Sequence, residues 1–227
     1  MAIDKLLSTA VKLYLRSQVT QAEDLQVKII GKNRQILQGY IPQVFLSCNR
    51  AVYQGLYLRQ VELKGSEIAF NLPEVLKKKP LKLEPILVDI KLSLDATDLQ
   101  ASLDSSLLQS GLSDLWQIIL SANNIFPTAL ADLVIEWHSI KIAAGDLNLI
   151  GTYQDNTGKT KELNLFTRIN LTDSHTLCLS PLKIKSEFLC DRTAEKLEID
   201  LGTDVVIEQL VMESEQILCS GKIRINN

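Results

Sequence analysis

The feature that most restricts how this chain can fold is a two-residue alternation of apolar and polar side chains. The longest run places Ile86, Val88, Ile90, Leu92 and Leu94 at every second position, with mostly polar residues between them. Successive side chains of a strand point to opposite faces, so this run predicts a strand with one face buried and the other in water. Similar runs occur at residues 25–29, 44–48, 163–171, 182–188 and 223–225. Together they predict a mainly antiparallel β protein.

A second pattern predicts how some of these strands are connected. Apolar residues separated by two, five and two positions occur three times, beginning at Val61, Ile140 and Leu210. The four residues inside each pattern match a short turn, so each copy predicts a β-hairpin. A further turn at residues 156–159 predicts that the second hairpin continues as a meander.

Two segments have helical rather than strand periodicity. Residues 1–18 carry apolar side chains at helical spacing and predict an amphipathic helix. Residues 95–122 predict a central helical section, with Asp95 and Ser113 as candidate N-caps of two helices. No linker rich in Pro, Gly or Ser divides the chain, so residues 1–227 are predicted to form a single domain.

The predicted strands present more apolar surface than these helices can cover. We therefore expect an α+β fold in which a long, curved antiparallel sheet wraps around the N-terminal and central helices, or else two sheets that pack face to face. In the first case an apolar groove remains between sheet and helices, and it suits an aliphatic ligand. The predicted lining of this groove is Ile86, Val88, Ile90, Leu92, Leu94, Leu99, Leu103, Leu115 and Ile119.

The composition and the absence of known motifs argue against most kinds of catalytic, metal and cofactor site. The chain has only two His residues, and it contains no phosphate-binding GxxxxGK[ST] loop, no GxGxxG and no GxSxG nucleophile motif. We predict no catalytic residues, no metal site and no cofactor; an enzyme would require an unrecognised site near His138 or the scattered acids. With 24 Lys and Arg against 27 Asp and Glu, nucleic acid is not an expected partner. The four Cys residues occur singly, which predicts buried free thiols, with a disulfide as the alternative that their spacing leaves open.

The sequence also predicts where the protein acts. No export signal and no apolar run long enough to span a membrane is visible, so a cytoplasmic location is expected, with reversible contact to a membrane surface. The candidate contact is a basic run containing Lys77, Lys78, Lys79 and Lys82, which would bind anionic headgroups. The N-terminal helix could lie in the same interface, although docking on the protein's own sheet is the favoured reading.

Several ordered stretches resemble one known family. They are residues 36–41 (ILQGYI), 55–63 (GLYLRQVEL), 75–77 followed by Pro85, 94–103 (LDATDLQASL), and 200–202 (DLG) followed by Gly221. In this order they resemble the LmeA-like phospholipid-binding proteins of bacteria, cyanobacterial members in particular. The resemblance implies a non-enzymatic protein that binds phospholipid and has a fold similar to the tubular lipid-binding class. Two differences are the missing export signal and Gln100, which stands where the family signature has Asn.

Two functions follow as hypotheses. The first is binding or carriage of phospholipid or another acyl lipid in an apolar groove, with contact to an anionic membrane surface. The alternative is a structural or scaffold module with a closed core, which binds unidentified protein partners along an exposed strand edge.

Overall fold

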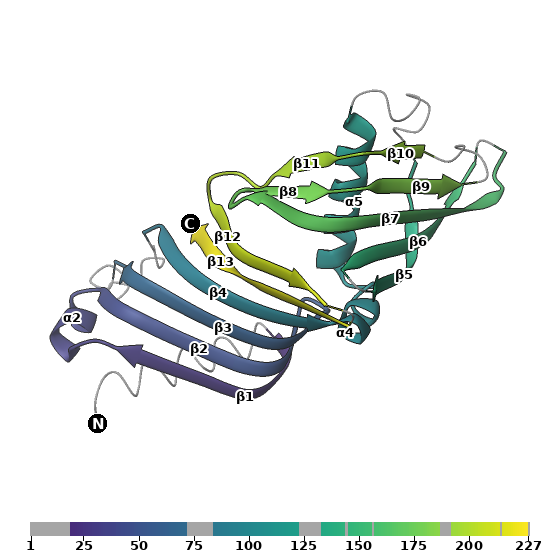
Figure 1. The fold of residues 1–227 in the computed structure, drawn as a ribbon. Coiled ribbons are helices and arrows are strands. Elements are labelled where there is room, and N and C mark those ends of the chain that lie inside the picture. Colours follow the sequence, from purple (N-terminus) through teal and green to yellow (C-terminus); the bar gives the residue numbers. More distant parts are fainter. Residues whose placement is uncertain are drawn as a thin grey trace.

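The computed structural model describes residues 19–71, 84–122, 133–143, 145–155, 157–186, 192–213 and 215–226. Within them the chain is mostly antiparallel β-sheet with a few helices, in agreement with the α+β class. The predicted helix at residues 1–18 lies outside the described residues. The strands form two sheets that lie side by side (Figure 1).

The first sheet has six strands in the order β1-β2-β3-β4-β13-β12. Their bounds are β1 Val19–Ile30, β2 Tyr40–Tyr53, β3 Leu56–Ala69, β4 Ile86–Asp95, β13 Gln216–Ile225 and β12 Val205–Met212. All neighbouring strands are antiparallel. The last strand of the chain, β13, pairs with β4 along its whole length, so the C-terminal hairpin completes a sheet that the N-terminal third begins.

The second sheet has seven strands, five of them in the order β10-β9-β7-β6-β5. Their bounds are β10 Arg192–Ala194, β9 Leu182–Ser186, β7 Thr160–Asp173, β6 Asp146–Gln154 and β5 Glu136–Ala143. The short strands β8 (Thr176–Leu179) and β11 (Leu197–Asp200) pair with each other, and β8 also pairs with β7. The prediction of one long sheet is therefore corrected to two sheets. The reason is topological, because the chain leaves β4 through helices and builds the second sheet before it returns in β12.

Three helices are described: α2 (Asn33–Leu37), α4 (Ala96–Ala101) and α5 (Ser106–Ser121). The last two occupy the central segment. Ser105 is the N-cap of α5, and its hydroxyl oxygen accepts a hydrogen bond from the Leu108 N–H at 3.1 Å. The expected cap at Ser113 is wrong, since Ser113 lies inside α5. Both serines precede apolar residues at helical spacing, so the sequence pattern alone does not distinguish them.

Two of the three predicted hairpins are confirmed: β5 pairs with β6, and β12 pairs with β13. The hairpin predicted from Val61 is wrong, because β3 runs unbroken from Leu56 to Ala69 between β2 and β4. Glu67 in this strand has a φ of 55°, and Ile68 next to it packs beside Ile41. A left-handed residue inside a strand, rather than a turn, thus produces the five-residue gap.

The main hydrophobic core lies between α4, α5 and the inner side of the seven-stranded sheet (Figure 1). It includes side chains that have essentially no exposed surface, among them Ile119, Leu149, Leu163, Leu165 and Ile184. The central helices therefore pack mainly on the second sheet.

Candidate functional site

The six-stranded sheet has one continuous apolar face. Strand pairing aligns Val27, Leu46, Leu63, Ile90, Gly221 and Ile207 in a row that crosses all six strands. A neighbouring row contains Ile29, Val44, Gly65, Val88, Ile223 and Val205. On the other side of the first row lie Cys48, Val61, Leu92, Cys219 and Leu210. These three rows define what we call the apolar face.

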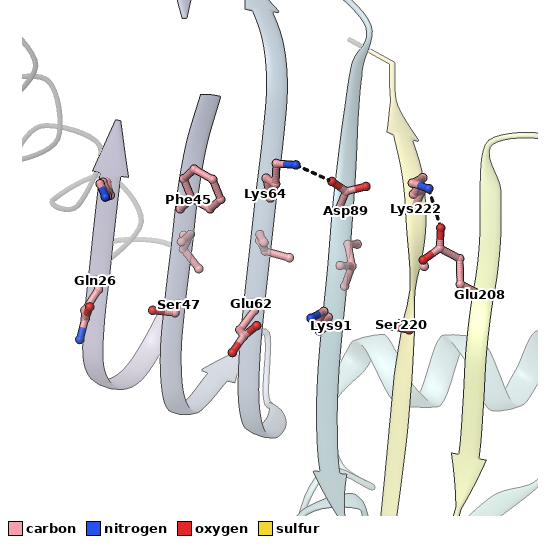
Figure 2. Close-up of a pocket in the computed structure, with 15 residues that line it drawn as sticks. Gln26, Phe45, Ser47, Glu62, Lys64, Asp89, Lys91, Glu208, Ser220 and Lys222 are labelled. Carbon is pink, nitrogen blue, oxygen red and sulfur yellow. Dashed lines mark hydrogen bonds and ion pairs between the residues drawn. The ribbon is translucent and has the colours of Figure 1, made fainter. Parts of the chain in front are cut away.

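The opposite face of the same sheet is polar. One row contains Gln26, Ser47, Glu62, Lys91 and Ser220, and the next contains Lys28, Phe45, Lys64, Asp89 and Lys222. Figure 2 shows side chains of both rows around an open hollow of about 580 Å³. Lys64 forms an ion pair with Asp89 at 3.6 Å, and Lys222 forms one with Glu208. Paired charges of both signs are typical of a solvated surface, so this hollow does not match an aliphatic ligand.

Burial differs between the apolar face and the main core. Within the apolar face, Leu46, Leu63 and Ile90 are half-buried, whereas Ile29, Cys48, Val61 and Val88 are buried. In the main core, Leu149 and Leu163 have no exposed surface. Among the described residues, the two hydrophobic clusters on the apolar face contain side chains of strands, of the segment just after β3 and of α2, and none of α4 or α5. The apolar face is therefore distinct from the closed core between helices and sheet.

The predicted groove residues fall into two groups. Ile86, Val88, Ile90 and Leu92 belong to β4 and face the apolar side of the six-stranded sheet. Leu99, Leu103 and Ile119 are buried in the main core, and Leu115 is partly buried against it. The structure therefore does not bring all nine residues around one space.

The two groups meet where the sheets join. Leu94 at the end of β4 packs against the main core together with Met212 and Ile217, which lie in the same row of the first sheet. An unbroken apolar strip therefore runs from the apolar face to the core of the second sheet. The apolar-face residues of β1, β2, β12 and β13 were not among the predicted lining residues, although their alternation was the signal that could have identified them.

Two thiols lie on the apolar face. Cys48 and Cys219 belong to the same row, separated by Val61 and Leu92. Both are free, as predicted, and burial raises the pKa of each thiol above its ordinary value. Cys178 in the second sheet is also free and buried, whereas Cys190 lies outside the described residues. These thiols provide natural probes of access to each region.

Both His residues lie among the described residues, and each contacts a polar group of another strand or loop. His138 is exposed, and its Nε2 atom lies 2.6 Å from the Thr152 hydroxyl oxygen. His175 Nδ1 lies 2.7 Å from the Val205 carbonyl oxygen. No group of three His, Cys, Asp or Glu side chains that could hold a metal ion occurs in the part of the chain described by the structure.

The membrane-contact prediction concerns residues that the structure does not describe. Lys77, Lys78, Lys79 and Lys82 all lie in the gap between Asn71 and Glu84, so their contact with a membrane stays a prediction. None of the described helices has the length and apolar character needed to cross a bilayer.

One of three comparisons with known proteins identifies the family of this chain. Neither a search of curated proteins nor a search of solved structures finds a match. A family model described as LmeA-like phospholipid-binding matches residues 2–222, which is nearly the whole chain. The chain therefore belongs to the LmeA-like phospholipid-binding family.

Proposed function

We propose that this protein binds and carries phospholipid by holding acyl chains against the apolar face of the six-stranded sheet. The observation that supports this most directly is the half-burial of Leu46, Leu63 and Ile90 at the centre of a face that crosses six strands. The fold proposed for the loaded protein is the tubular arrangement that the family resemblance implies, with helix on the apolar side of a curved sheet. Binding involves no covalent chemistry, so the protein acts as a carrier and not as an enzyme.

The dimensions and energetics of the apolar face suit an acyl chain. β4 has ten residues, and a strand rises about 3.3 Å per residue, which makes the face about 33 Å long in this direction. Each methylene transferred from water to an apolar surface contributes about 0.8 kcal/mol. Burial along part of this length is therefore sufficient for stable lipid binding, and the strip at Leu94, Met212 and Ile217 extends it towards the second sheet.

The first test measures bound lipid directly. Protein purified without detergent is extracted with organic solvent, and the extract is analysed by mass spectrometry. We expect phospholipid in the wild type and several-fold less in Ile90→Gln, which places an amide on the apolar face. Lys91→Gln is the matched control, because Lys91 is the next residue of β4 and belongs to the polar face. Equal lipid in both variants, or none in the wild type, would contradict the proposal.

A second test needs no substitution and therefore does not depend on how a variant folds. Delipidated protein is treated with a maleimide before and after incubation with phospholipid, and modification of each Cys is followed by peptide mass spectrometry. Lipid should slow the reaction of Cys48 and Cys219 and leave that of Cys178 unchanged, because only the first two lie on the apolar face. Unchanged rates at all three would favour a scaffold with a closed core.

A further inference from the structure

We infer that the corner formed by the end of β1, α2 and the start of β2 docks on bilayers that contain anionic phospholipid. This inference rests on the proposed function and adds the place at which the carrier meets a membrane. The corner consists of Lys28, Ile30, Lys32, Arg34 and Leu37, and it includes none of the lysines in the undescribed segment. Figure 1 shows α2 at the end of the six-stranded sheet that lies away from α4.

All charged residues of the corner are basic, which favours contact with an anionic membrane. From residue 25 to residue 61 the sequence contains no Asp or Glu. Two of the basic residues in this stretch are already paired, Arg50 with Glu23 and Arg59 with Asp95. Because these two side chains already have carboxylate partners, they are not counted among the cations that would contact headgroups.

The other three basic residues of this stretch, Lys28, Lys32 and Arg34, are exposed. Among the described residues, none of them has a carboxylate within ion-pair distance. Unpaired cations close together on a surface attract anionic headgroups. The corner is therefore complementary in charge to an anionic bilayer.

The corner also exposes two large apolar side chains, which favours contact with the interior side of the membrane interface. Ile30 is 41% exposed and Leu37 is 56% exposed. Along the chain both lie next to the three basic residues, and apolar side chains combined with basic residues are characteristic of surfaces that lie in the membrane interface.

The corner packs against the sheet through α2. Ile36 of α2 is 3% exposed and packs with Ile29 and Ile41. At Gly31 an added Cβ would lie 2.9 Å from Pro42 Cδ, so β1 and β2 approach closely just before the helix. Because Ile36 fixes the inner side of α2, Leu37 is held on the outer side.

The location of the corner connects docking to lipid binding. Ile29 belongs both to the apolar face and to the cluster that holds α2. Leu87 and Ile225, which are each 47% exposed, lie at the same end of the sheet. Glu84 is the first described residue after the predicted lysine run. It lies at this end of the sheet as well, because its N–H donates to the Ala69 carbonyl at 3.1 Å. Acyl chains thus enter the apolar face from the end that contacts the bilayer.

The test is sedimentation of the full chain with vesicles of phosphatidylcholine alone or mixed with phosphatidylglycerol. We expect binding to the anionic vesicles, weakened by raising the salt concentration from about 0.1 M to about 0.5 M. Replacing Lys32→Glu and Arg34→Glu together should reduce binding at least about 25-fold, since each lost cation accounts for about fivefold. Ile30→Ser with Leu37→Ser should also reduce binding, and this loss should persist at high salt.

The matched control is Lys141→Glu with Lys185→Glu. These lysines are exposed on the second sheet and have no ion pair within the described part of the chain, so the same change of net charge should leave vesicle binding within about twofold of the wild type. If the corner variants bind vesicles as the wild type does, or if the control loses binding equally, the inference is wrong.

The lipid content of each variant separates this inference from the proposed function. Corner variants that fail to sediment with vesicles should still take up phospholipid presented in detergent micelles, and their Cys219 should still be protected from maleimide. Wild-type protein that binds vesicles through the corner but contains no extractable lipid would overturn the carrier proposal and leave docking intact. Capture of the corner by another protein, with no vesicle binding, would overturn the docking inference.

Discussion

At Gly221 the strands β12 and β13 approach each other closely on the apolar face. A Cβ at this position would collide with the Val206 carbonyl group and would lie 3.0 Å from Ile207 Cα. The close approach coincides with a register shift of β12 between Ile207 and Gln209. A bulge bends its strand and brings its backbone over the neighbour, so position 221 has no space for a side chain.

We therefore expect Gly221→Ala to lower the free energy of unfolding by about 1–3 kcal/mol, the range for overpacking. The measurement is urea denaturation followed by circular dichroism. Gly111→Ala is the control with the opposite expected sign. Gly111 lies in α5, and nothing is within 4 Å of its Cβ position, so Ala should stabilise the helix by about 0.5–1 kcal/mol. Stabilisation by both substitutions would disprove the steric account of Gly221.

The short helix α4 is the element that joins the two sheets. Its Gln100 side chain donates to the His138 carbonyl at 3.0 Å and accepts from the Ile140 N–H at 2.9 Å. One carboxamide thus pairs with two backbone groups of β5, the outermost strand of the second sheet, in the way a neighbouring strand would. On the side of the first sheet, the buried Ser102 at the end of α4 accepts from the Tyr57 N–H at 2.8 Å.

Gln100→Ala removes both hydrogen bonds to β5. We expect faster amide hydrogen exchange at Ile140 and a loss of about 1 kcal/mol in the free energy of unfolding, because the N–H is only partly buried and water replaces the amide in part. Exchange is measured by NMR or mass spectrometry. Gln117→Ala is the control, since Gln117 is an exposed residue of α5. Equal exchange at Ile140 in both variants would show that Gln100 does not protect this edge.

The whole molecule combines a closed core with a sheet face that is less completely buried. The main core lies under α4 and α5, while the apolar face of the first sheet contains its own smaller clusters. If the protein binds lipid only in its folded state, as the proposed function requires, lipid should stabilise the native state as a whole, including the second sheet, which joins the first at Leu94.

We expect phospholipid at about 100 times its dissociation constant to raise the free energy of unfolding of delipidated protein by about 2.7 kcal/mol. Urea denaturation with and without added lipid provides the measurement, and Ile90→Gln should show a smaller increase than Lys91→Gln. If the protein is shown to contain bound lipid and its urea unfolding transition is nevertheless unchanged, lipid would have to bind the unfolded chain as well as the folded one.

The sequence by itself determined the class of fold, the character of each strand face and the family. Alternation such as that of residues 86–94 reports local geometry, because side-chain direction in a strand depends only on position along it. The family resemblance likewise depends on local stretches in a fixed order. Strand alternation does not specify which strands pair. In the same way, the five-position gap between Leu63 and Ile68 fits a turn as well as it fits a left-handed residue, here Glu67, inside a continuous strand.

Only the tertiary structure decided that the strands form two sheets and that the predicted groove residues divide between them. Leu92 and Leu99 are seven positions apart and equally apolar, yet Leu92 faces the first sheet's apolar side and Leu99 lies in the core beneath the second. The physical reason is that β13 pairs with β4 from the far end of the chain. A long-range pairing of this kind fixes which surfaces are closed by helices, and no local pattern contains that information.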